Sequence, residues 1–351
     1  MKKYLLSIFS LCFAALAVAQ EAEANPSPWS CNGVIGLNAS ATGLVNWAAG
    51  GNNNVNGVAF GKVRLLYNEN NISWETNLNL EYGLSFIDQE YDPFQKTSDV
   101  IDFNTKLGWQ FHKSWFLTAA AGFKSQFDVG KAYDGTAADD QVVSMFLAPS
   151  YTNISVGIDW KPNDIFSIYL SPVAGQITTA VIGDPMQEEY AEMYPLENGG
   201  LRQAMQEKYA TWTYSKTANA DGTYDKIYKN FKAELGLTFK GSINYTYKDL
   251  KIITTLGLFT PYAWDKTEMF DAENKFIGYR DNNRRFGNFD VDWDAAISYQ
   301  FLKCLNVTLS TSLKYYNGVK IEKFDEEGVS LGAAERVQFK GILGLGIGYS
   351  F

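Results

Sequence analysis

A strict alternation of apolar and polar side chains constrains this chain more than any other feature. Over residues 72–86 every second residue is apolar or aromatic, apart from Thr76, and the residues between them are Ser, Glu, Asn or Gly. The pattern returns over residues 289–301 and 337–351. A period of two is typical of β-strands with one apolar face, and these runs exceed the roughly five to six residues of an ordinary strand. We therefore expect an all-β chain, folded as a transmembrane antiparallel up-and-down β-barrel and not as a soluble β-sandwich.

The alternation predicts about twelve strands, an even number as bacterial barrels require, with about ten or fourteen as alternatives. The predicted strands lie near residues 33–47, 54–68, 72–86, 97–111, 114–128, 144–160, 165–178, 228–247, 249–262, 286–302, 305–318 and 335–351.

The connections between these strands alternate in length. The even-numbered connections are turns of a few residues, whereas the odd-numbered ones are long, apart from the first, near residues 48–53. This alternation is expected when both termini lie in the periplasm, because periplasmic turns are short and extracellular loops are longer. The largest predicted extracellular loop, 179–227, contains two stretches that could form short helices over the outer mouth, 185–190 and 201–209.

The first 19 residues have the organisation of a secretory signal peptide. Lys2 and Lys3 precede an apolar run that ends in an Ala-Val-Ala triplet. The run is too short for a membrane-spanning helix, which needs about 20 apolar residues, so we expect cleavage after Ala19. Residues 20–32 then form a predicted periplasmic tail, and residues 33–351 a predicted barrel in the outer membrane of a Gram-negative bacterium.

The acidic balance of the chain limits its partners. The formal net charge is -9, and loss of Lys2 and Lys3 with the signal peptide would leave 28 basic against 39 acidic residues, a charge of -11. This balance argues against nucleic acid as a partner. Outer-membrane lipid is the expected environment, and no cofactor is predicted.

The cysteines and the single histidine bear on covalent links and on catalysis. Cys31 and Cys304 remain after signal cleavage, and both fall near the predicted inner rim, where an oxidising periplasm would permit a disulfide between them. His112 falls in a predicted turn beside Trp115. Barrel hydrolases commonly need a histidine base, and one histidine with two separated cysteines makes no zinc site, so we expect no enzyme.

The last strand, VQFKGILGLGIGYSF, resembles the C-terminal targeting signal of outer-membrane barrels. Tyr349 and Phe351 occupy the positions that match this signal. The resemblance implies recognition and insertion by the barrel-assembly machinery.

A narrower resemblance begins at residues 46–52, NWAAGGN, which are similar to the NWxxGG stretch near the first strand of a family of bacterial outer-membrane barrels of unknown function. Residues 124–127, 148–151 and 171–175 look like further landmarks of that family. The family implies a fold and a location, but no reaction.

The charges decide which face of each strand meets lipid. A lysine that faces lipid at mid-bilayer costs about 2–4 kcal/mol, a large part of the ~5–15 kcal/mol that stabilises a typical domain. The charged face should therefore point into the lumen, and counting back by twos from Phe351 then places Tyr349 in lipid. The predicted lumen charges are Arg64, Glu75, Asp102, Lys124, Asp290, Asp292, Asp294, Lys314, Arg336 and Lys340.

Two meanings of these charges remain open. Pairing about the turn centres places Arg64 opposite Glu75 and Asp102 opposite Lys124, so the charges could brace a closed barrel. Alternatively, the aspartates within 290–294 face basic residues across a narrow pore for small polar solutes. Barrel size does not decide, because about eight strands are filled by side chains and about 16–18 leave an aqueous channel. A non-conducting structural, assembly or partner-binding component is the alternative function, and a barrel hydrolase comes third.

The aspartate row could also hold calcium, but only with ligands from loops. Same-face neighbours on a strand are ~6.8 Å apart, whereas calcium oxygens lie ~2.4 Å from the ion. We therefore expect no metal site.

Overall fold

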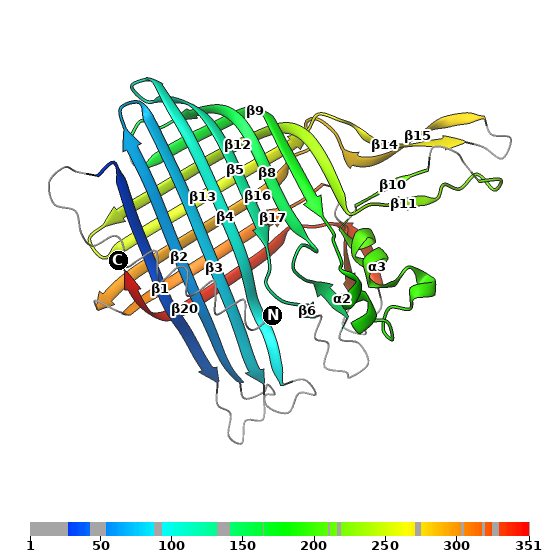
Figure 1. Ribbon diagram of the computed structural model, residues 1–351, viewed down its shortest axis with the longest axis horizontal. Coiled ribbons are helices and arrows are strands. Elements are labelled where there is room, and N and C mark those ends of the chain that lie inside the picture. The colour runs from blue at the N-terminus through cyan, green and yellow to red at the C-terminus, as the bar shows by residue number, and fades with distance from the viewer. Residues whose placement is uncertain are drawn as a thin grey trace.

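Twelve strands form a closed antiparallel barrel in which each strand bonds to the barrel strands before and after it (Figure 1). This computed structural model describes residues 27–42, 54–87, 93–131, 141–163, 165–209, 211–215, 219–270, 275–302, 305–317, 320–324 and 330–350. The barrel strands are β1 (Trp29–Thr42), β2 (Asn54–Glu69), β3 (Ile72–Ile87), β4 (Phe94–His112), β5 (Trp115–Ser125), β8 (Ser150–Trp160), β9 (Phe166–Thr179), β12 (Phe231–Tyr247), β13 (Leu250–Pro261), β16 (Asp290–Leu302), β17 (Leu305–Tyr315) and β20 (Gln338–Ser350). The predicted fold class and strand number are confirmed.

The two faces of the barrel wall differ in chemistry. Outward-pointing Leu235, Leu309 and Leu343 are exposed, Leu343 to 74%, whereas the opposite parity of their strands carries charged, small polar and glycine residues. Each such side chain would lose ~1.5–3 kcal/mol of burial free energy if it were left in water. When it faces lipid, it lies in an apolar environment instead. An apolar outer band around a polar interior is the arrangement of an outer-membrane β-barrel.

Aromatic rings gather at the end of the barrel that carries the short turns. The ring centroid of Trp29 lies 4.9 Å from that of Tyr67 and 5.7 Å from that of Trp74, and Trp115 lies 6.2 Å from Trp160. Amphipathic rings favour the depth at which lipid tails meet headgroups. These rings therefore mark the membrane boundary on the side of the short turns.

The first strand begins at Trp29, four residues before its predicted start at residue 33. The ladder between β1 and β2 continues to the pair Trp29 and Tyr67, and the contact between their rings stabilises this end. Residues 29–32 thus belong to the barrel wall and not to the predicted tail. Residues 20–26 of the tail, the signal peptide and residues 43–53, which include the NWxxGG stretch, lie outside the described residues.

Cys31 consequently lies within the β1 ladder, opposite Leu65, and is a free, exposed cysteine. Its predicted disulfide partner, Cys304, lies outside the described residues. We expect mass spectrometry of the protein, alkylated without prior reduction, to find Cys31 alkylated. A peptide pair linked through Cys31 and Cys304 would contradict this.

The predicted strand over residues 144–160 is divided. Its barrel part begins at Ser150, and β7 (Val142–Ser144) instead pairs with β6 (Gly130–Lys131) outside the barrel. Pro149, directly before β8, has no backbone N–H with which to continue the ladder. The proline therefore ends the regular pairing at this point.

Three predicted long loops contain two-stranded hairpins. The hairpin nearest the C-terminus ends at Glu335, so the final barrel strand begins at Gln338 and not at residue 335 as predicted. Arg336 therefore precedes this strand. Phe351 lies outside the described residues. The hairpins are β10 (Trp212–Tyr214) with β11 (Lys226–Tyr228), β14 (Asp265–Phe270) with β15 (Phe276–Arg284), and β18 (Lys320–Phe324) with β19 (Ser330–Glu335).

Short helices lie at the long-loop end of the barrel, close to the predicted positions (Figure 1). They are α2 (Asp184–Glu189), the 3₁₀ turn η2 (Leu196–Asn198) and α3 (Gly200–Lys208). None of the described helices is long and apolar enough to cross a membrane. The helices share a buried apolar cluster with the region of β7, formed by Val142, Met145, Ala148, Ala180, Ile182, Leu201 and Met205.

The barrel closes where β1 meets β20, and this seam is short. Five residue pairs join the two strands, from Val34 and Ser350 to Asn38 and Gly346, whereas each other pair of neighbouring barrel strands shares between 10 and 16. A Cβ on Gly36 would lie 2.6 Å from the backbone carbonyl oxygen of Ile347 in β20, so only glycine allows this close approach of the two strands. The closure therefore depends on a glycine in β1.

Candidate functional site: the charged lumen

The register of the strands places the charges on the inner face. Asp102 pairs with Lys124, and Asp292 pairs with Lys314, on the parity opposite to the exposed leucines. Lys340 shares the inward register through its partner Ser312, although its side chain is not described. Arg336 lies before β20 and has no place in the barrel ladder.

Arg64 and Glu75 meet on a diagonal. In the ladder Arg64 lies opposite Asn77, two residues from the predicted register, because β2 and β3 continue to a two-residue turn in which Asn70 is left-handed with φ 53°. The Nε atom of Arg64 nevertheless donates to Oε1 of Glu75 at 2.8 Å. A long side chain thus compensates for the shifted register.

A second charge cluster lies on the wall near the turns. The ammonium groups of Lys106 and Lys161 both pair with Asp159, which is fully buried, and the Lys161 distance is 3.5 Å. The Lys106 ammonium also lies 5.1 Å from the ring centroid of Tyr169. Two cations around one buried carboxylate leave a net positive charge here.

The central cluster contains charges of both signs and space for solvent. The Lys124 ammonium lies 3.6 Å from Asp102, and the Lys314 ammonium lies 3.3 Å from Asp292. Inside the barrel the side chains of Lys124 and Asp292 keep 44% and 42% of their surface accessible. Water therefore has room beside these groups.

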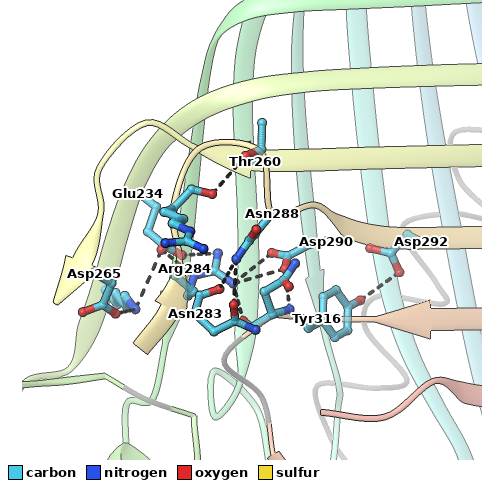
Figure 2. A network of polar contacts seen from close by, with 12 residues as sticks. Glu234, Thr260, Asp265, Asn283, Arg284, Asn288, Asp290, Asp292 and Tyr316 are labelled. Atoms are coloured by element: carbon cyan, nitrogen blue, oxygen red, sulfur yellow. Dashed lines mark hydrogen bonds and ion pairs between the residues drawn. The ribbon is translucent and has the colours of Figure 1, made fainter. Parts of the chain in front are cut away.

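Tyr316, directly after β17, donates its hydroxyl to Oδ1 of Asp292 at 2.8 Å (Figure 2). Burial raises the pKa of Tyr316, and the adjacent carboxylate of Asp292 raises it further. The phenol therefore stays protonated and acts as a donor at physiological pH.

Arg284 is the centre of a buried network at the barrel mouth (Figure 2). Its Nε and Nη2 atoms donate to the two carboxylate oxygens of Glu234, each at 2.8 Å. Its Nη1 atom donates to Asp290, at 3.0 and 3.2 Å, and to the carbonyl of Asn317 at 2.8 Å. One guanidinium thus ties the β14–β15 hairpin to β12, β16 and the segment after β17.

The charge of Arg284 is secured by this network. Burial by itself would lower the pKa of Arg284, but the carboxylates of Glu234 and Asp290 outweigh it and hold the pKa above its usual value. Asp290 in turn accepts a hydrogen bond from the backbone N–H of Asn317 at 2.8 Å. Asp290 and Asp292 of β16 therefore have different partners, and no group of three or more potential metal ligands comes together in the described part of the chain.

Several residues that matter here were absent from the predicted set. Lys106 and Asp159 lie on the inward parity of predicted strands, so the alternation could have identified them. Arg284 lies outside the predicted strands, whereas Tyr316 falls in the predicted strand 305–318 on the same parity as Lys314. No local pattern indicates the partners of either residue.

The similarity of this chain to known proteins is distant. No curated protein matches the chain. Among solved structures it is similar to the translocator domain of the autotransporter NalP from Neisseria meningitidis (8% identity, TM-score 0.34, covering 100% of this chain and 98% of that one). It is also similar to an outer membrane channel from Pseudomonas putida F1 (10% identity, TM-score 0.37, covering 95% and 98%). Likeness at this level carries no argument about function.

A family model matches part of the chain. It is described as "Protein of unknown function (DUF3078)" and covers residues 39–130, which run from β1 to β6. The remaining strands have the same alternation and complete the same ladder. The chain is thus an outer-membrane β-barrel protein whose residues 39–130 match the DUF3078 family.

Proposed function

We propose that the protein is a narrow passive pore for small polar solutes. The observation that carries this proposal is the direction of the ion pairs. Arg64 with Glu75, Asp102 with Lys124, and Asp292 with Lys314 each join adjacent strands and so lie along the wall. Pairs along the wall line a passage with both signs of charge, whereas pairs between opposite walls would obstruct it.

The accessible surface of the central charges supports the same function. Charged side chains in a filled interior would be fully desolvated, at a cost of several kcal/mol per ion after relaxation. Lys124 and Asp292 keep more than a third of their surface accessible. A solvated lumen stabilises their charged forms and offers polar solutes a hydrated path.

The first test is conductance of the purified protein in planar bilayers. We expect small channel currents, a shift toward cations for Lys124→Glu and a shift toward anions for Asp292→Lys, read from the reversal potential in a salt gradient. Lys113→Glu is the matched control, because Lys113 is exposed in the turn after β4 and should leave selectivity unchanged.

The long extracellular loop could still cover the mouth, so a second variant keeps this test decisive. Deletion of residues 183–224 removes both helices while leaving all barrel strands in place. Absence of current from both the folded full-length protein and the folded deletion variant would overturn the pore. A difference in gel migration between the unheated and the heated protein would verify that each barrel is folded.

A partner-binding component is the second candidate, supported by the β14–β15 hairpin. Trp264, Phe276, Ile277 and Tyr279 are exposed large apolar or aromatic residues on or beside this hairpin, which points away from the barrel (Figure 1). Such residues are enriched at binding surfaces. A barrel hydrolase has less support, because a register shift before His112 pairs it with outward-pointing Trp115, away from the lumen carboxylates.

A further inference from the structure

Two side chains of opposite charge form no ion pair although they lie near each other in the lumen. Lys240 of β12 and Asp294 of β16 are both exposed, and neither side chain has a hydrogen bond or ion pair with any residue that the structure describes. Their neighbours Lys124 and Asp292 on the same inner face are paired. Two opposite charges that stay apart in an enclosed space do not gain the attractive energy of an ion pair.

The register explains why these two side chains do not reach each other. Lys240 lies opposite Gly257 of β13, which lies opposite Asp292. Asp294 lies one inward step further along β16, opposite Thr255. Two strand spacings and two residues separate the Cα atoms of Lys240 and Asp294 by ~12 Å. The head groups therefore flank a gap.

Gly257 forms the floor of this gap. It has no side chain, and a Cβ added there would meet only Asp292, at 3.7–3.8 Å. Any larger residue would project into the space between Lys240 and Asp292, and the other inward residue of β13 at this level, Thr255, lies beside Asp294. The wall is thus recessed beside the free cation.

The opposite wall of the barrel also carries charges that act on Lys240 and Asp294. Lys124 interacts electrostatically with both Asp292 and Asp294, and Lys240 interacts with both Asp102 and Lys124. β5 and β16 are separated by four strands in one direction around the barrel and six in the other, so they lie nearly opposite each other. A solute at this level would therefore pass between Lys124 on one wall and Asp294 on the other.

From this geometry we infer that Lys240 and Asp294, with Gly257 beside Lys240, form a site for a small zwitterion that carries one ammonium and one carboxylate group. This inference rests on the proposed pore and specifies its solute class. The carboxylate would bind Lys240 and the ammonium would bind Asp294, so both free charges gain a partner. A simple anion or cation would satisfy only one of them, and an uncharged solute neither.

The test is block of the single-channel potassium chloride current by alanine, with lactamide as an uncharged solute of similar size. We expect alanine to block at a lower concentration than lactamide, acetate or methylammonium. Lys240→Gln and Asp294→Asn should each raise the half-blocking alanine concentration about tenfold, as expected for loss of one charge-assisted hydrogen bond. The exchange variant Lys240→Asp with Asp294→Lys should recover part of the block.

Lys62→Gln is the matched control, since Lys62 also points into the lumen, from β2, and lies over the ring of Phe60. It should leave the half-blocking concentration unchanged. A conducting barrel that alanine blocks equally in wild type, Lys240→Gln and Asp294→Asn would overturn the zwitterion site while leaving the pore intact. Block by acetate or methylammonium as strong as by alanine would also overturn it. Absence of current altogether would instead count against the proposed pore.

Discussion

Replacement of Arg284 by alanine is expected to lower the free energy of unfolding by about 3–5 kcal/mol, because it leaves partly buried carboxylates without their cation. Glu234 would keep only Lys232, at 3.8 Å, and Asp290 would keep the backbone N–H of Asn317. Urea unfolding in lipid vesicles, followed by tryptophan fluorescence, measures this loss. Arg284→Lys should recover only part of it, since an ammonium cannot form the paired hydrogen bonds of a guanidinium.

The adjacent Arg285 provides the control for this experiment. Its side chain is 53% exposed and pairs with Asp281 at 3.1 Å. An exposed pair of this kind contributes about 0–1 kcal/mol, so Arg285→Ala should unfold almost as the wild type does. Equal losses from Arg284→Ala and Arg285→Ala would show that the mouth network does not stabilise the barrel.

The second large effect concerns the two faces of one strand. Leu309→Lys places an ammonium in lipid near the middle of β17 and should lower the free energy of unfolding by about 2–4 kcal/mol. Ser310→Lys changes the next residue, at nearly the same depth, but points into the lumen, where its cross-strand neighbours are Ala296 and Ile342. We expect it to have a much smaller effect in the same vesicle unfolding assay.

This comparison tests the assignment of the faces directly. A loss for Ser310→Lys as large as that for Leu309→Lys would mean that the lumen is as apolar as the membrane. Such a result would also contradict the solvated interior on which the proposed pore depends.

The outer face and the number of strands followed from the sequence because both depend on local order. A period of two needs only neighbouring residues, and lipid penalises a charge on the wrong face whichever strand lies alongside. The pairing of Asp102 with Lys124 was also predictable, since a short turn joins their strands. Arg64 pairs two residues away from its predicted partner, because the sequence did not reveal which asparagines form the turn.

Contacts between distant segments could not be read in the same way. Pro149 interrupted the predicted strand at 144–160. The first strand begins earlier than predicted because the ring of Trp29 packs against residues of neighbouring strands. Arg284 lies in a hairpin without lumen periodicity, and nothing in its local sequence indicates Glu234, 50 residues earlier. Arg284 contacts Glu234 only because the β14–β15 hairpin folds back onto the barrel mouth.

The sequence by itself determined that this chain forms a membrane barrel with an apolar outer face and a charged interior, because alternation and the cost of charge in lipid act residue by residue. Only the tertiary structure decided which charges neutralise one another. Closing the barrel fixes the register across strands such as β12, β13 and β16, and this register keeps Lys240 and Asp294 apart.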